Sequence, residues 1–277
     1  MSNYKVLVAD PIADAGIEEL QADPDLDVDV RIGIKEDELL KDAALYEAII
    51  VRSQTKITPQ VIESADNLKI VGRAGVGVDN IAIPTATTNG VIVMNTPAGN
   101  TISTAEHAFA LMASLARNIP QAHATVIGGG WGRKGYKGVE LNGKTLAILG
   151  MGRIGTEFAK RAVAFGMNVT AYDPYLSPSR AKALQVELFQ EVDEIVKGAD
   201  FITLHMPLTD ETKHIIDGRR MALCKNDVRI INCARGGLID EHALLESVNS
   251  GNVAGAALDV YEESEPPPEG YALLKSE

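Results

Sequence analysis

The sequence predicts an α/β protein built from two doubly wound parallel-sheet domains. Short apolar segments alternate with amphipathic segments along most of the chain, which is the pattern of strands and covering helices in a parallel sheet. The segment Gly150–Gly155 has the GxGxxG spacing of a dinucleotide-binding loop. The strand before this loop begins only at Thr145, so a whole domain's length of chain precedes it.

The first domain is expected at residues 1–98, because this part of the chain contains a series of short segments rich in Val, Ile and Leu. We expect strands at Val6–Ala9, Val28–Ile32, Ala48–Val51, Lys69–Gly72 and Val91–Met94. The segments Ile12–Leu20 and Glu36–Ala43 are amphipathic and are expected to be helices that cover the sheet.

The second domain is expected at residues 99–277 and opens with a long helix pattern over Thr101–Asn118. Pro120 follows as a stop signal, and the glycine-rich residues 127–138, with Trp131, are expected to form a loop that can reach a partner subunit. The expected strands are Thr145–Leu149, Asn168–Tyr172, Phe201–Leu204, Val228–Ile231 and Val253–Leu258.

Composition and charge exclude several classes of function. Of the 277 residues, 45% are hydrophobic and 23% are charged, as in ordinary globular proteins, and the net charge of −12 argues against nucleic acid or an anionic membrane as a partner. No apolar run is long enough to span a membrane, and the first strand begins too early for a signal peptide. The two cysteines, Cys224 and Cys233, form no CxxC pair, so we expect reduced thiols and a cytoplasmic protein. The histidines have no metal-ligand spacing, and we assign no metal.

The glycine loop predicts how a dinucleotide is held. Gly150 permits a tight turn, Gly152 lets the backbone approach a pyrophosphate, and Gly155 lets the helix pack closely on the strand. The free N–H groups of the first helical turn face the anion. Asp173 ends the next strand and can accept hydrogen bonds from the ribose hydroxyls. Because Asp173 repels a 2′-phosphate and is followed by Pro174-Tyr175 rather than arginine, we expect NAD rather than NADP.

Two further loops follow strand ends, where ligands of doubly wound sheets bind. Asn232–Gly237 comes directly after a strand, and its Arg235 can bind a carboxylate through two hydrogen bonds and polarise a carbonyl. The alternative is a surface arginine that caps a turn. Gly72–Asn80 contains small residues whose successive N–H groups can form a nest for a carboxylate, or only a tight turn.

Acidic and imidazole side chains also lie near predicted strand ends. Glu262, Glu263 and Glu265 precede a run of prolines and are either a solvated loop or a functional cluster. His205 ends a strand and can line the cofactor site or pack in the core. His107 lies on the long helix and is interpreted as a residue of the helix face.

Taken together, these segments resemble the D-isomer-specific 2-hydroxyacid dehydrogenases. The resemblance is carried in family order by residues 51–56, 72–81, 116–122, 149–155, 232–241 and 256–261, and it covers essentially the whole chain. It implies a flavodoxin-like, substrate-binding first domain and a Rossmann NAD-binding second domain. It also implies a homodimer or homotetramer formed through the helix Thr101–Asn118 and the loop of Trp131.

The resemblance further implies a reaction. The most similar members oxidise 3-phospho-D-glycerate to 3-phosphohydroxypyruvate with NAD, the first step of L-serine biosynthesis. Arg52 and Lys56 favour a phosphorylated small-molecule substrate. Other members are glyoxylate/hydroxypyruvate reductases or D-lactate dehydrogenases, and these activities remain alternatives.

The resemblance also implies roles for individual residues. The cofactor residues are Gly150, Gly152, Arg153, Ile154 and Gly155 at the pyrophosphate, Asp173 at the ribose, and Met206, Cys233, Ala234 and Asp259 at the nicotinamide half. The substrate residues are Arg52, Ser53, Gly75, Val76 and Gly77, and the catalytic residues are Arg235 and Glu265.

The sequence departs from the family pattern in two ways. The family's glutamate precedes a proline five residues after the aspartate that matches Asp259, where this chain has Ser264, so we expect Glu265, or else Glu263, in that role. The family pairs this glutamate with a histidine in a later Pro-His motif, and here no histidine follows His242. We therefore expect a piece of a longer enzyme, in which the first domain lacks its returning segment and exposes an apolar face, and the second lacks its last strand. The alternative is a non-catalytic NAD-binding module.

Overall fold

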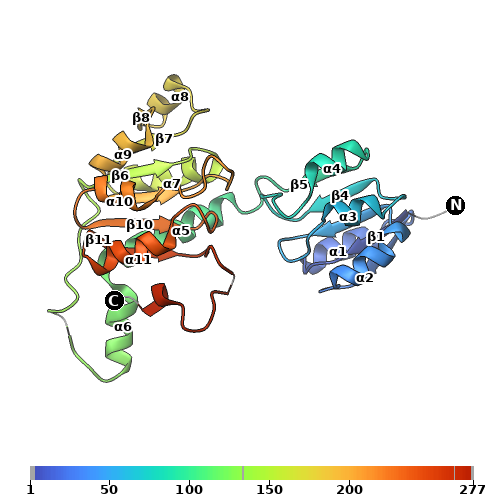
Figure 1. Cartoon of the computed structure of the whole chain (residues 1–277), viewed down its shortest axis with the longest axis horizontal. Helices are drawn as coiled ribbons and strands as arrows, with labels where there is room; N and C mark the ends of the chain where they lie inside the picture. Colours follow the sequence, from blue (N-terminus) through green and yellow to red (C-terminus); the bar gives the residue numbers. More distant parts are fainter. Residues whose placement is uncertain (1–3, 133, 265, 276–277) are drawn as a thin grey trace. The chain divides into compact units, whose positions relative to one another are not determined.

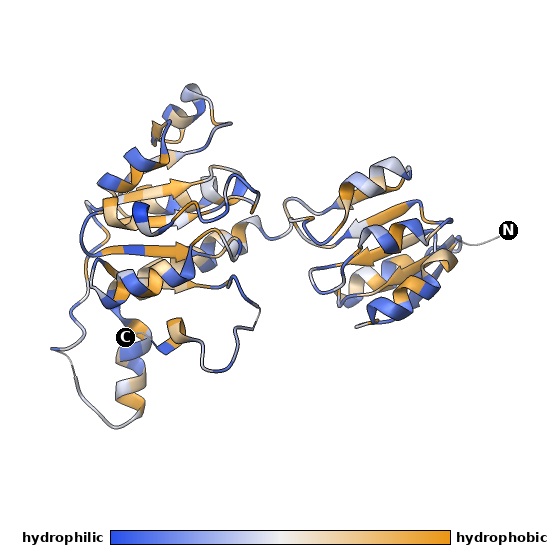
Figure 2. Cartoon of the chain, in the orientation of Figure 1, coloured by the Kyte–Doolittle hydropathy of each residue, from blue (hydrophilic) through white to orange (hydrophobic). Residues whose placement is uncertain are grey.

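The computed structural model of the chain describes residues 4–132, 134–264 and 266–275. The chain divides into two compact units, Met1–Asn100 and Thr101–Glu277 (Figure 1). In both units most strands are apolar along their length, and the helices mix apolar with polar residues (Figure 2). This pattern is that of a buried sheet covered by amphipathic helices.

The first unit contains a five-stranded sheet in which every neighbouring pair is parallel. Its strands are β1 (Tyr4–Val8), β2 (Leu26–Val30), β3 (Ala48–Val51), β4 (Ile70–Arg73) and β5 (Ile92–Asn95). The strand order β2-β1-β3-β4-β5 is the flavodoxin-like order, as expected. Carboxyl ends of all five strands therefore meet at one edge of this sheet.

One face of this sheet carries the core of the first unit. The helices are α1 (Asp14–Gln21), α2 (Glu36–Asp42), α3 (Pro59–Glu63) and α4 (Ile83–Thr88), with a short 3-10 turn, η1 (Ala43–Leu45). Leu39 of α2 and Val61 of α3 belong to the same buried cluster as Ile49 of β3. On β4 and β5, by contrast, the side chains of Ile70, Ile92 and Met94 are exposed. Ile70 pairs in register with Ile92, so these side chains share one face and form an exposed apolar row.

The second unit contains a six-stranded parallel sheet. Its strands are β6 (Thr145–Leu149), β7 (Asn168–Tyr172), β8 (Glu187–Phe189), β9 (Phe201–Leu204), β10 (Val228–Asn232) and β11 (Val253–Leu258). The order β11-β10-β9-β6-β7-β8 is that of a Rossmann sheet. The strand order reverses between β6 and β9, which is where such sheets bind dinucleotides.

Helices cover both faces of the second sheet. They are α5 (Thr101–Arg117), α6 (Ile119–Ile127), α7 (Arg153–Ala164), α8 (Pro178–Ala183), α9 (Val192–Gly198), α10 (Gly218–Leu223) and α11 (Glu241–Asn249), with a 3-10 turn, η2 (Ala272–Lys275). Residues of β6 alternate between two cores, since Ile148 packs with α5 and α7 and Leu149 packs with α9, α10 and α11. None of the helices in the described part of the chain combines the length and apolar character that a bilayer crossing needs.

Pro120 has a different role from the one predicted. Instead of only ending the long helix, it lies in the first turn of a second helix, α6. Asn118, in the left-handed conformation at φ 52°, separates α5 from α6. Proline is favoured in the first turn of a helix, because its missing N–H has no intrahelical partner there.

Candidate functional site

The glycine loop between β6 and α7 has the geometry of a dinucleotide-binding turn. Gly150 has φ +98°, and a Cβ there would lie 2.5 Å from the carbonyl oxygen of His205. A Cβ on Gly155 would lie 2.1 Å from the carbonyl oxygen of Gly150. At Gly152, by contrast, a Cβ would meet no heavy atom of the described residues within 4 Å. Gly150 and Gly155 are therefore required by the fold itself, while Gly152 leaves the backbone open to a ligand.

The start of α7 supplies a site for an anion. The helix has 12 residues and begins at Arg153, and Gly152 provides no side-chain cap. Its first-turn N–H groups and the positive end of its dipole therefore face the open side of Gly152. The side chain of Arg153 is exposed beside them and Ile154 is half-buried. These residues suit a pyrophosphate, and their binding of one stays a prediction.

Asp173 lies at the end of β7, where a ribose is expected, and it also organises the glycine loop. One carboxylate oxygen, Oδ2, accepts a hydrogen bond of 2.7 Å from the N–H of Met151. Oδ1 accepts one of 2.8 Å from the N–H of Tyr175. Because each carboxylate oxygen has two lone pairs, Asp173 can still accept hydrogen bonds from ribose hydroxyls.

The four residues predicted near the nicotinamide lie after the carboxyl ends of three adjacent strands. Met206 follows β9, Cys233 and Ala234 follow β10, and Asp259 follows β11. The N–H of Asp259 donates to the carbonyl of Asn232 at 3.0 Å, which joins the ends of β10 and β11. Burial, and then the charge of Asp259, raise the pKa of Cys233 to about 12, so its thiol is protonated at neutral pH.

The loop of Arg235 is held rigidly at the end of β10. The side chain of Asn232 donates to the carbonyl of Arg235 at 2.9 Å and accepts from the N–H of Ala234 at 3.0 Å. A Cβ on Gly236 would lie 1.9 Å from the carbonyl oxygen of Tyr261, so only glycine permits this backbone approach. Arg235 itself is half-buried, and its Nη1 donates to the carbonyl of Ala234 at 2.6 Å.

The acidic segment after β11 lies partly outside the described residues. Glu265, the predicted catalytic glutamate, lies outside the described residues. Its alternative, Glu263, has an exposed side chain. Glu262 forms a hydrogen-bonded pair of 2.8 Å between its Oε1 and Nε2 of His214.

A buried carboxylate with no predicted role anchors this segment. Glu241 begins α11 and is 6% exposed. Its Oε1 accepts from the N–H of Glu262 at 2.8 Å, and its Oε2 accepts from the hydroxyl of Tyr271. Burial raises the pKa of Glu241, and these two hydrogen bonds oppose that shift. Sequence reasoning quoted Glu241 only within a motif and missed both Tyr271 and His214.

Two histidines differ in environment. Burial lowers the pKa of His205 to about 4, its Nε2 lies 3.1 Å from the Thr203 hydroxyl, and its ring packs 5.1 Å from that of Phe158. The packing interpretation therefore holds for His205. His107 belongs to the helix face as predicted, and its Nε2 lies 3.3 Å from Oδ1 of Asp259.

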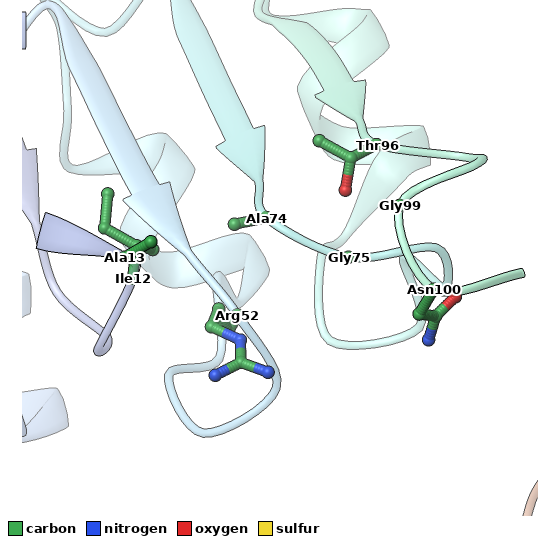
Figure 3. A pocket seen from close by; sticks show the side chains of 8 residues that line it. All are labelled: Ile12, Ala13, Arg52, Ala74, Gly75, Thr96, Gly99 and Asn100. Carbon is green, nitrogen blue, oxygen red and sulfur yellow. The ribbon is translucent and has the colours of Figure 1, made fainter. Parts of the chain in front are cut away.

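The first unit contains a shallow cavity of about 300 Å³ at the carboxyl edge of its sheet (Figure 3). Its lining residues are Ile12, Ala13, Arg52, Ala74, Gly75, Thr96, Gly99 and Asn100. Arg52 and Gly75, two of the five predicted substrate residues, line this one cavity, whereas Ser53, Val76 and Gly77 are not among its lining residues.

A buried aspartate fixes the rim of this cavity. Asp10 follows β1 and is fully buried. It accepts hydrogen bonds from the N–H of Arg52 at 2.6 Å and from the N–H and hydroxyl of Thr55 at 3.1 and 2.6 Å. Asn80 donates to the carbonyls of Arg52 and Thr55 at 2.7 Å each. Sequence reasoning missed Asp10, although a carboxylate directly after an apolar strand was a usable signal.

In the described ranges 4–132, 134–264 and 266–275, no three His, Cys, Asp or Glu side chains cluster in a way that could hold a metal ion. The chemistry-bearing groups are instead guanidinium groups, open backbone N–H groups and single carboxylates. Such groups bind anions and polar organic ligands.

The sequence and the structure of this chain are similar to those of known proteins. Residues 109–277 match the family model of the D-isomer specific 2-hydroxyacid dehydrogenase, NAD binding domain. The chain is similar to the D-3-phosphoglycerate dehydrogenase of Archaeoglobus fulgidus, with 51% identity over 98% of this chain and 51% of the relative. It is also similar to that of Methanocaldococcus jannaschii, with 50% identity over 98% of this chain and 51% of the relative. The chain thus spans about half the length of these relatives.

Among solved structures, a glyoxylate reductase from Paecilomyes thermophila superimposes with a TM-score of 0.89. Its sequence is 32% identical, and the match covers 99% of this chain and 86% of that one.

Proposed function

This chain belongs to the D-isomer-specific 2-hydroxyacid dehydrogenase family and carries its NAD-binding domain. We propose that it takes part in the NAD-dependent oxidation of 3-phospho-D-glycerate. The product is 3-phosphohydroxypyruvate, and the reaction is the first step of L-serine biosynthesis. The observation that carries the proposal is the likeness of nearly the whole chain to D-3-phosphoglycerate dehydrogenases at about half identity.

In this proposal the glycine loop holds NAD. The backbone at Gly150, Gly152 and Gly155 and the first turn of α7, with Arg153 and Ile154, bind the pyrophosphate. Asp173 accepts hydrogen bonds from the ribose hydroxyls, and its negative charge disfavours a 2′-phosphate. NAD, when bound, supplies the hydride acceptor.

The strand ends of the second unit then serve the nicotinamide half and the substrate. Met206, Cys233 and Ala234 line the ring, and the carboxylate of Asp259 accepts from the carboxamide. Arg235 binds the substrate carboxylate and polarises the neighbouring carbon–oxygen bond, as a guanidinium can with two parallel hydrogen bonds. Because the protonated Cys233 thiol is neutral, it packs against the ring without competing as a nucleophile.

The first unit contributes the anion-binding cavity. We assign Arg52 and Ser53 to the phosphate and the N–H groups of Gly75, Val76 and Gly77 to the carboxylate. A local guanidinium is needed because the chain as a whole carries a net charge of −12 and repels an anionic substrate. Glu265 is assigned as the partner of a general acid/base.

The test is NADH formation at 340 nm with NAD and 3-phosphoglycerate, beside D-lactate and glycerate, together with a separate titration of NADH binding. We expect turnover specific to 3-phosphoglycerate from the chain extended through the family's Pro-His motif. Arg235→Gln should lower kcat/KM by about 10² or more, as for other groups that stabilise charge in the transition state. Arg180→Gln, on the exposed helix α8, is the matched control and should leave the rate unchanged. Preferred turnover of lactate would refute the substrate. NADH binding with no turnover even in the extended chain would favour a non-catalytic module.

We assign assembly to the same unit, as a homodimer or homotetramer formed through α5, α6 and the loop of Trp131. In support, α6 contains no buried residue, and Ile127 and Trp131 are 73% and 77% exposed. Light scattering should report a dimer or a tetramer that Trp131→Glu dissociates. A monomeric unaltered chain would refute this assignment.

The two free cysteines support a reducing, cytoplasmic location.

A further inference from the structure

A side-chain contact between α5 and the end of β11 has no role in the function described so far. His107 lies in the second turn of α5, and its Nε2 is 3.3 Å from Oδ1 of Asp259. Both side chains are about half exposed, at 50% and 53%. The pair therefore lies at the surface of the carboxyl edge of the sheet and is not a buried structural contact.

The groups around His107 and Asp259 show which partners each side chain has. The neighbouring carboxylate, Glu106, pairs with Arg161 at 2.9 Å, on α7. The backbone N–H of Asp259 is fixed by its hydrogen bond to the carbonyl of Asn232. The negative charge of Asp259 contributes to the raised pKa of the nearby Cys233 thiol. The backbone of Asp259 is thus fixed by the sheet, and one oxygen of its carboxylate lies within 3.3 Å of the His107 imidazole.

We propose that His107 is a positioning residue that aligns the Asp259 carboxylate for the nicotinamide carboxamide. This inference rests on the proposed NAD function. The imidazole holds Oδ1 and so directs Oδ2 toward the ligand. A half-exposed carboxylate without such a partner samples several rotamers, and ligand binding has to select one of them at an entropic cost. A partner that orders the carboxylate in advance removes part of that cost.

The inference is tested by comparing two ligands that differ only beyond the second ribose. NADH carries the nicotinamide and ADP-ribose lacks it, so a residue that acts through Asp259 affects only NADH. His107→Asn should weaken NADH binding by about two- to five-fold, the size expected for a half-exposed pair, and should leave ADP-ribose binding unchanged. In an Asp259→Asn background the same substitution should have no further effect, because the two residues act as one unit.

His242→Asn is the matched control. His242 is an exposed histidine whose Nδ1 lies 3.7 Å from Glu246 one turn along α11. Its substitution should change neither affinity. The inference is overturned if His107→Asn weakens both ligands equally, if it leaves NADH binding unchanged, or if its effect persists in the Asp259→Asn background. If the unaltered chain binds neither ligand, the NAD proposal fails and this inference fails with it.

Discussion

Gly155 and Gly152 lie three residues apart, yet alanine at these two positions should have opposite effects. In Gly155→Ala the new Cβ would lie 2.1 Å from the carbonyl oxygen and 3.1 Å from the carbonyl carbon of Gly150. Both are backbone atoms, so no side chain can rotate away. The start of α7 has to move from the preceding turn by about 1 Å before the contact becomes ordinary.

The magnitude follows from two opposing terms. Overpacking of this kind costs about 1–3 kcal/mol, and replacing glycine by alanine inside a helix returns about 0.5–1 kcal/mol. The difference between these terms is about 0–2.5 kcal/mol. Because the contact is with rigid backbone atoms, we expect Gly155→Ala to lie in the upper part of this range, at about 1–2.5 kcal/mol, and to lower the Tm of the second unit by about 2–10 °C. In Gly152→Ala the Cβ meets no described heavy atom within 4 Å, and φ of −64° suits alanine. Its stability should change by less than about 0.5 kcal/mol.

Binding should show the reverse order. The Cβ of Gly152→Ala would occupy the open side of the loop, where the pyrophosphate is proposed to lie, so NADH affinity should fall by about ten-fold or more. The assays are thermal unfolding followed by circular dichroism and NADH titration followed by fluorescence, with both variants beside the unaltered chain. An unchanged Tm for Gly155→Ala would refute the packing argument. Unchanged NADH affinity for Gly152→Ala would refute the assignment of the open side to the cofactor.

Three further predictions concern buried groups. Asp10→Ala should destabilise the first unit by about 2–4 kcal/mol in urea unfolding, because it leaves buried donors without an acceptor, whereas Asp14→Ala in the exposed first turn of α1 should have little effect. A pKa of about 4 for His205 means that the unfolded chain binds a proton more readily between pH 6.5 and 4. Stability of the second unit should therefore fall by at most about 3 kcal/mol as pH drops through this window, and a His205→Gln variant with the same pH slope would contradict this. Burial raises the pKa of Cys224 to about 11 and that of Cys233 to about 12, so a thiol reagent at pH 7.5 should modify the folded chain slowly and the denatured chain at once.

Most strands were predictable because strands covered on both faces are nearly continuous apolar runs. The predicted bounds of Thr145–Leu149, Asn168–Tyr172 and Phe201–Leu204 match those of the structure. By contrast, β8 has only three residues, begins with an exposed glutamate and lies at the sheet edge, so it has no such run. Helix α6 was missed because Pro120 is compatible both with the end of one helix and with the start of the next.

The candidate site was predictable where its chemistry depends on residue type in a local pattern. The glycines of the loop before α7 and Arg235 after β10 belong to this class, because turn geometry and strand ends are visible in the sequence. Asp10 and Glu241 belong to another class. Asp10 contacts a residue 45 positions away, and Glu241 contacts residues 21 and 30 positions away. The position of Asp10 directly after an apolar strand marks it as a candidate, but the partners of both carboxylates depend on tertiary packing, which no local pattern reports.

Helix α6 offers a way to test the proposed assembly of this chain. A nine-residue helix with no buried residue is too short to persist in water by its own hydrogen bonds, and the left-handed Asn118 separates it from the cooperative unit of α5. Its amide protons should therefore exchange rapidly with deuterium whenever its apolar side chains face solvent. They should become protected once another surface covers them. The exchange rate of the α6 amides thus reports, at each protein concentration, the fraction of molecules in which α6 is covered. No probe has to be attached to the protein.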